Sequence, residues 1–385
     1  MSKPIAIIHG TLIDGNGGIP ISDSTIVLRN DKIEAVGVFG AVGIPEDARM
    51  IDASGKFLIP GLIEGHGSVG GYDGIYVLQE SVKWGITSVV TVSGGEDGVR
   101  LREAIQKNRI KECAKLIVGG VVCSTAGHLK THTADGPWEI RRSVRHYAEI
   151  EVDFIKTAAS LGVWAENEKL SARNYTAEEL EALADEARAW DLTSIVHVHT
   201  DPGLSNAIEA GIDQIHHGQL ASPEHIHAIA DKGLYYMPIL KITSKRNYSS
   251  WDSRPWMQKK MMDAAPNHRD AVRLARDLGV KLMVGCIYPG PGDRWICGEG
   301  TSFEMMELQD CGLSPMEILM AATKYNAEGY GKGHLIGTLE AGKQADIVLL
   351  ERDPLKDISV LHDRSNIRMV FCDGRKVYDR EMQEE

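Results

Sequence analysis

The sequence lacks several features that mark specialised classes of protein. Although 43% of its 385 residues are hydrophobic, it has no apolar run of roughly 18 residues, the length that a membrane-spanning helix needs. Its six cysteines include no CxxC pair, so we expect buried, reduced thiols rather than a disulfide framework. The first residues show no signal-peptide pattern, which favours a cytoplasmic location.

Basic residues are too few for a typical nucleic-acid-binding protein. The 42 Lys and Arg are outnumbered by 54 Asp and Glu, which gives a formal net charge of −12. Proteins bind phosphate backbones through basic patches, so we expect a small-molecule substrate and neither nucleic acid nor a membrane as a partner. A chain of this length suits one large domain with a small appended one.

Both ends of the chain read as short strands. Segments 5–8, 25–28 and 33–36 are apolar and are separated by Gly, Asp and Asn. Segments 345–350 and 369–377 are strand-like in the same way. Such spacing is typical of hairpins. We therefore predict one β-sandwich built from both termini, residues 1–58 and 336–385.

The middle of the chain alternates strand-like and helix-like segments. A capping box, Thr176 with Glu179, opens one of the helices. Alternation of this kind predicts βα units around a parallel sheet. We predict a (β/α)8 barrel over residues 59–335, in which chemistry gathers at the C-terminal ends of the strands. Its strands include residues 88–92, 115–118, 154–156, 194–197, 214–217 and 281–284.

Polar residues end several of these apolar strands, where a strand buried on both faces should itself be apolar. Lys156, His197 and His217 are in such positions, and a lysine is rarely buried without a function or a partner. Side chains alternate along a strand, so His199 should face the same side as His197. By the same rule we expect His216 to point away from His217, toward the helix layer, in a structural role.

Further candidates come from neighbouring segments. His66 follows the apolar pair at 62–63, and Cys286 follows the strand at 281–284. His128 lies in a loop and is a possible substrate contact. Tyr236 belongs to an aromatic group that lines a pocket or packs a loop, and Lys241 either holds a substrate carboxylate or lies in a solvated basic loop. Histidines on predicted helices are expected to be solvated: His225, His227 and His268.

Several motifs together resemble the amidohydrolase superfamily. Within that superfamily, the motifs are most similar to those of the imidazolonepropionase-like, Xaa-Pro dipeptidase and phenylurea hydrolase branch. The matching segments span nearly the whole chain: 52–63, 84–88, 134–136, 141–145, 153–156, 197–200, 215–218 and 342–348.

This resemblance implies a role for each matching residue. Lys156 would be carbamylated, which turns an amine into an oxygen ligand, and His197 and His217 would bind the same metal ion. His66 matches the first histidine of a pair that binds a second ion. The second histidine of that pair is replaced by Ser68, and the catalytic aspartate by Ile287.

Counting ligands then predicts a single zinc ion. Carbamylated Lys156, His197 and His217 make three protein ligands with an open position, as catalytic zinc requires, whereas His66 and the shared carbamate are too few for a second ion. Ser68 becomes a candidate substrate contact. Another group must replace the aspartate as the base, and the sequence does not choose among five: His66, His199, Glu64, Cys286 and Tyr288.

Three functions are compatible with these residues. The first is a mononuclear hydrolase of an amide, urea, carbamate or related C–N bond in a small organic molecule. The second is a metal-free lyase, isomerase, decarboxylase or cyclase in which Lys156 is a bare amine, with a pKa depressed by burial. The third is a barrel kept only for binding or assembly. The resemblance also implies a homo-oligomer.

Overall fold

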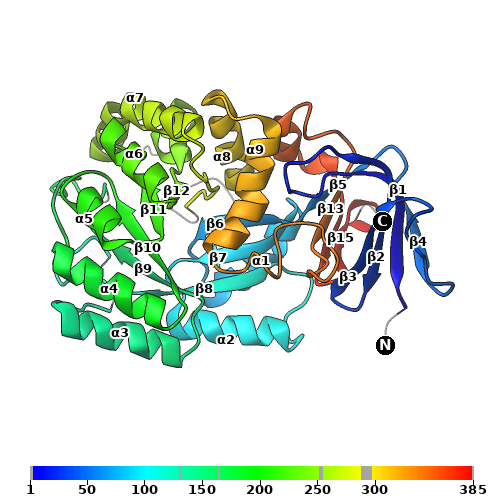
Figure 1. Ribbon diagram of the computed structural model, residues 1–385, viewed down its shortest axis with the longest axis horizontal. Coiled ribbons are helices and arrows are strands. Elements are labelled where there is room, and N and C mark those ends of the chain that lie inside the picture. The colour runs from blue at the N-terminus through cyan, green and yellow to red at the C-terminus, as the bar shows by residue number, and fades with distance from the viewer. Residues whose placement is uncertain (1–2, 130–131, 164, 251–254, 288–296, 384–385) are drawn as a thin grey trace.

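Two sheets organise the chain. The computed structural model describes residues 3–383 except 130–131, 164, 251–254 and 288–296. In Figure 1 the two ends of the chain lie together in one sheet, while the middle of the chain forms a curved sheet surrounded by helices. We call the first the terminal sheet and the second the half-barrel.

The terminal sheet joins both ends of the chain. Its order is β15-β14-β13-β5-β1-β2-β3, with β4 paired to β1. The antiparallel pair β5–β13, with Ile59 opposite Val348, connects the N-terminal to the C-terminal part. Its strands are β1 (Ile5–Leu12), β2 (Ile21–Arg29), β3 (Lys32–Val38), β4 (Arg49–Asp52), β5 (Phe57–Pro60), β13 (Ile347–Leu350), β14 (Ile367–Cys372) and β15 (Arg375–Asp379).

The half-barrel is parallel throughout. Its strands follow one another in chain order, β6 to β12, as expected for successive βα units. They are β6 (Leu62–Gly67), β7 (Ile86–Thr91), β8 (Lys115–Val121), β9 (Phe154–Ala158), β10 (Thr193–Val198), β11 (Gln214–His217) and β12 (Tyr235–Met237).

Helices cover the outside of the half-barrel (Figure 1). Thr176 caps α4, since its hydroxyl accepts the Glu179 amide proton at 3.3 Å, which confirms the predicted capping box. The helices are α1 (Gly71–Val82), α2 (Gly95–Gln106), α3 (Pro137–Glu149), α4 (Ala177–Ala189), α5 (Gly203–Ala210), α6 (Pro223–Asp231), α7 (Pro255–Asp277), α8 (Glu299–Asp310), α9 (Pro315–Met320) and α10 (Asn326–Gly329).

A short segment, residues 281–284, lies between the first and last strands of the half-barrel. Met283 donates its amide proton to Tyr236 O of β12 at 2.9 Å, and Gly65 of β6 donates to Val284 O at 3.1 Å. The parallel α/β architecture predicted for the middle of the chain is thus confirmed. The complete (β/α)8 barrel, the sandwich and the domain boundaries stay predictions.

Two expectations about composition can be compared with the fold. All six cysteines are unpaired and buried, which confirms the expectation of reduced, buried thiols. Within the described ranges, no helix combines the length and the apolar character that crossing a membrane requires.

Candidate active site

The C-terminal strand ends of the half-barrel bring basic side chains together. The group, which we call the histidine cluster, consists of His66, Lys156, His197, His199, His216 and His217. The rings of His197 and His217 lie 4.4 Å apart between centroids, those of His197 and His199 lie 4.5 Å apart, and those of His66 and His217 lie 5.6 Å apart. Strands β6, β9, β10 and β11 supply all of these residues except His199, which directly follows β10. The predicted convergence of Lys156, His197 and His217 at strand ends thus has a structural counterpart.

Several nitrogens of the cluster lack a hydrogen-bond partner. His197 Nε2 and His217 Nδ1 are buried, and no group in the described part of the chain bonds to them. Both nitrogens of His199 are in the same state. Buried polar atoms are nearly always satisfied in folded proteins, so neighbouring unsatisfied imidazoles indicate that a ligand belongs there.

His216 occupies a position that the strand-alternation argument got wrong. Its Nδ1 lies 3.0 Å from His66 Nδ1 and 3.3 Å from Lys156 Nζ, so it faces the cluster and not the helix layer. Alternation along β11 sends Gln214 and His216 inward. His217 breaks this rule because its backbone is left-handed, with φ of 75°, which turns its ring toward the other histidines.

Burial keeps the cluster largely uncharged. Desolvation lowers the pKa of His66, His197, His216 and His217 well below the ordinary histidine value, and repulsion from neighbouring basic groups adds to this. Neutral imidazoles offer lone pairs, as metal ligands and bases require.

The same desolvation acts on two further members of the cluster. It lowers the pKa of Lys156 to about 7 and that of His199 to about 3. A lysine amine with this pKa is substantially unprotonated near neutral pH, and so retains its nucleophilic lone pair.

His128 adds a wall to the cluster. Its ring stacks on His197, with centroids 4.2 Å apart and planes inclined by 11°, and its Nδ1 lies 3.3 Å from Glu168 Oε1. A substrate contact at His128 is therefore geometrically reasonable and remains a prediction. His268, expected to be solvated on its helix, is instead fully buried on α7 beside the Thr243 hydroxyl, because the helix turns this residue inward. His227 is exposed, as expected.

Cys286 lies apart from the cluster, in a second buried network. Glu64 Oε1 accepts the backbone protons of both His66, at 2.7 Å, and Cys286, at 2.8 Å. Burial raises the pKa of the Cys286 thiol well above its ordinary value, which keeps it protonated. Lys241 is buried and donates to Cys286 O at 3.3 Å. Glu64 and Lys241 thus hold backbone in place near the end of the 281–284 segment.

Of the remaining candidates from the sequence, one supports the backbone of the cluster and another is exposed on the surface. Tyr236 is fully buried, and its hydroxyl donates to His217 O at 3.0 Å, so it supports the backbone that carries His217. Ser68 is exposed beyond the end of β6. Tyr288 lies outside the described residues.

Gln214 was not singled out from the sequence. It is fully buried on β11, and its Oε1 lies 3.1 Å from His216 Nε2. The available signal was a polar residue at the start of a strand that should be buried on both faces, which is the same signal that identified Lys156.

The protein atoms alone do not complete a metal site. Among the residues that the structure describes, no three histidine, cysteine, aspartate or glutamate side chains are placed to hold an ion together. His197 and His217 supply two nitrogens without partners, and Lys156 is the neighbouring basic group. This donor set fits a metal only if Lys156 provides the third ligand, and a carbamate on its amine would provide an oxygen.

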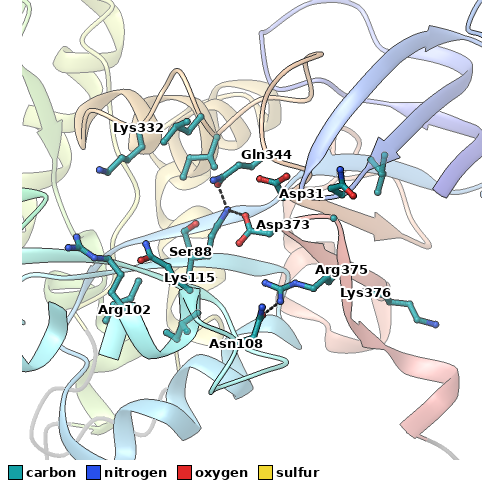
Figure 2. Close-up of a pocket in the computed structure, with 18 of the residues that line it drawn as sticks. Asp31, Ser88, Arg102, Asn108, Lys115, Lys332, Gln344, Asp373, Arg375 and Lys376 are labelled. Carbon is teal, nitrogen blue, oxygen red and sulfur yellow. Dashed lines mark hydrogen bonds and ion pairs between the residues drawn. The ribbon is translucent and has the colours of Figure 1, made fainter. Parts of the chain in front are cut away.

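A cavity of about 900 Å³ lies at the junction of the half-barrel and the terminal sheet. Figure 2 shows Lys115 at its centre, bonded to Gln344 and Asp373. Arg102 and Lys332, also on its wall, both pair with Asp153 at 2.6 Å. These cations are already neutralised by structural carboxylates and no member of the histidine cluster lines the cavity, so we interpret it as part of the contact between the two sheets.

The family of the chain follows from comparison with known proteins. The model of the amidohydrolase family matches residues 74–377, so the chain belongs to that family of hydrolases, which act on C–N bonds. This confirms the resemblance inferred from the motifs.

Individual relatives cover nearly the whole chain. Ochratoxinase from Aspergillus niger is 25% identical over 97% of this chain and 86% of that protein. Imidazolonepropionase from Geobacillus kaustophilus is 24% identical over 94% of this chain and 90% of that protein. A crystal structure of a Xaa-Pro dipeptidase with bound methionine in the active site superposes with a TM-score of 0.87, at 23% identity, over 98% of this chain and 100% of that one. That last likeness concerns the fold alone.

Proposed function

We propose that this protein hydrolyses an amide, urea, carbamate or related C–N bond of a small organic molecule, with the help of one zinc ion. The observation that carries the proposal is the pair of buried nitrogens without partners, His197 Nε2 and His217 Nδ1, on rings 4.4 Å apart. Membership of the amidohydrolase family supports the reaction class.

Lys156 is the proposed third ligand. A neutral amine adds carbon dioxide to form a carbamate, and the pKa of about 7 leaves much of Lys156 neutral near neutral pH. The carbamate would present oxygen to the ion beside His197 and His217. When bound there, zinc would act as a Lewis acid on the carbonyl group of the substrate.

The chain's own residues would bind and orient the substrate. His128, stacked on His197, forms a flat wall at one side of the cluster. His66 and His199 are neutral and lie within ring contact of His217, so both can exchange protons with a bound molecule. Desolvation around them strengthens every polar contact that a substrate makes.

Finer features of the molecule belong to the same proposal. The bonds that join residues 281–284 to β12 and β6 support a complete (β/α)8 barrel. The terminal sheet, built from both ends, supports the predicted sandwich domain. We extend the proposal to a homo-oligomer, following the resemblance described above, and to the cytoplasmic location expected from the sequence.

A hydrolysis assay tests the proposed function. Purified protein is incubated with N-acyl amino acids, aryl carbamates and aryl ureas, and amine release is measured with and without a chelator. We expect release from at least one class, its loss with chelator, and a loss of roughly 100-fold or more in kcat/KM for His217→Gln. The exposed His227→Gln is the matched control and should retain full activity. Hydrolysis that survives both the chelator and His217→Gln would contradict the metal-dependent mechanism.

A metal-free reaction is the second candidate. The observation that favours it is the partly neutral, buried amine of Lys156, with no complete site formed by His, Cys, Asp or Glu in the described part of the chain. In that case Lys156 would act as a base or as a nucleophile that forms a Schiff base. Trapping of a carbonyl substrate on Lys156 by borohydride would identify this chemistry, and the lack of any adduct would count against it.

A further inference from the structure

A chain of buried hydrogen bonds, which we call the relay, runs from the backbone of α10 to His66. Gln214 Nε2 donates to Gly329 O at 2.7 Å, and Gln214 Oε1 lies 3.1 Å from His216 Nε2. His216 Nδ1 then lies 3.0 Å from His66 Nδ1. Gln214 and His216 are both fully buried, so no water competes for these atoms.

The carbonyl oxygen of Gly329, at the start of this chain of hydrogen bonds, fixes which atom donates in each bond that follows. The carbonyl oxygen of Gly329 can only accept, so the Gln214 amide must turn its NH2 group toward it and its oxygen toward His216. That oxygen also only accepts, so His216 carries its proton on Nε2. Lys156 Nζ, whose N–H groups donate, lies 3.3 Å from His216 Nδ1, so this atom presents the accepting lone pair.

The same argument determines which ring nitrogen of His66 carries the proton. Two bare lone pairs would repel at 3.0 Å, so His66 Nδ1 carries a proton and donates it to His216 Nδ1. A His66 ring that carries its single proton on Nδ1 has an unprotonated Nε2. No described residue bonds to this nitrogen, and His66 keeps an exposed fraction of 6% beside His217.

We propose that Gln214 and His216 are positioning residues that hold His66 in the tautomer with an unprotonated Nε2, and that this nitrogen is the proton acceptor in place of the aspartate that Ile287 replaces. The inference rests on the proposed hydrolysis. His66 Nε2 takes one proton from a water molecule as its oxygen bonds to the substrate carbonyl carbon. The imidazole returns that proton to the leaving nitrogen as the C–N bond breaks, so each turnover consumes one water and leaves His66 unchanged.

The tautomer is read by ¹⁵N NMR on intact protein labelled with ¹⁵N-histidine. The resonances of His66 are assigned by their disappearance in His66→Gln. We expect a protonated Nδ1 and an unprotonated Nε2 in the wild type. In Gln214→Leu, His216 loses the acceptor for its Nε2 proton, so its proton moves to Nδ1 and His66 should change to the Nε2-protonated form.

Two further variants separate positioning from simple loss of structure. Gln214→Glu still accepts from His216 Nε2, so it should restore the His66 tautomer. Gln219→Leu also removes a buried glutamine near the cluster, but one whose bond goes to Met261 Sδ at 3.6 Å and not into the relay. It should leave the His66 signals unchanged. Circular dichroism and zinc content confirm that each variant is folded and loaded.

Kinetics complete the test on the substrate class that the wild type hydrolyses. We expect kcat to fall by about 10- to 100-fold in Gln214→Leu and by roughly 100-fold or more in His66→Gln, with KM little changed. Unchanged kcat and an unchanged His66 tautomer in folded Gln214→Leu would overturn the relay. A wild type that hydrolyses none of the substrates would overturn the proton-acceptor role, while the ¹⁵N spectra alone would still decide whether the relay exists.

Discussion

At the scale of single residues, burial decides which charges the interior holds. Five buried histidines and one lysine gather at the strand ends, and desolvation lowers the pKa of every one of them. The opposite shift occurs in the neighbouring acidic network. Glu304 on α8 is fully buried, and burial raises its pKa to about 8, although it accepts backbone protons from Leu240 and Lys241 at 2.7 Å each.

This shift predicts a pH-dependent stability. The folded protein holds the Glu304 proton up to about pH 8, whereas the unfolded chain releases it near the ordinary value of 4.5. The contribution of Glu304 is therefore fully present below the unfolded value and is lost as pH rises through the folded one.

Comparison of the wild type with Glu304→Gln isolates this contribution. The amide loses one acceptor and should lower the free energy of unfolding by about 1–3 kcal/mol at low pH. It should also remove a decline on the order of 3–4 kcal/mol that the wild type shows between about pH 5 and pH 8. Urea unfolding at several pH values measures both effects. Parallel pH curves for the two proteins would show that Glu304 does not titrate in this range.

At the scale of elements, β6 and residues 281–284 must approach unusually closely. Gly65 lies where a β-carbon would be 2.4 Å from Val284 O, so only glycine fits. Asn326 completes the contact, because its side-chain amide donates to both Ile63 O and Val284 O at 2.8 Å. The positions of His66 and Cys286 both depend on this contact, since Glu64 bonds the backbone of each.

Gly65→Ala should therefore separate β6 from residues 281–284. We expect a loss of about 1–3 kcal/mol in the free energy of unfolding, as in other overpacked cores. The matched control is Gly18→Ala, where no atom lies within 4 Å of the added carbon and the change should be close to neutral. Urea denaturation measures the difference. Equal stabilities of the two variants would mean that the strands accommodate a side chain at this point.

The elements also show how far sequence reasoning reaches. Strand-end positions identified Lys156, His197, His199 and His217, because a polar residue in a doubly buried strand is easy to recognise. The assignment of His216 to the helix layer failed, because it assumed a regular strand through His217, whose φ of 75° is a feature of the folded backbone. Such a turn depends on tertiary contacts, here including the Tyr236 hydroxyl on His217 O, and leaves no periodic signal.

At the scale of the whole molecule, buried charges join the two sheets. Lys115 at the start of β8 bonds Asp346 at 2.5 Å and Asp373 at 2.9 Å, both from the C-terminal part of the terminal sheet. Attraction to these carboxylates outweighs desolvation and raises the pKa of Lys115. The composition and hydrophobic pattern predicted the two architectures, but not this contact, because its partners are more than 200 residues apart in the sequence.

The family match extends over most of the chain, whereas the site consists of a few side chains. The amidohydrolase match and the fold are found over most of the chain, while the replacements that the resemblance implies at Ser68 and Ile287 concern two side chains. The histidine cluster lies at the strand ends of the half-barrel, with His216 Nδ1 3.0 Å from His66 Nδ1. The central claim is that the remaining donors, Lys156, His197 and His217, hold one metal ion.

Metal content per chain tests this claim most directly. Protein purified without added metal is analysed by plasma mass spectrometry, together with Lys156→Ala and with circular dichroism to confirm folding. The account predicts about one zinc per chain in the wild type and its loss in Lys156→Ala. A folded wild type without stoichiometric metal would contradict it, and the chemistry would then belong to Lys156 and the histidines alone.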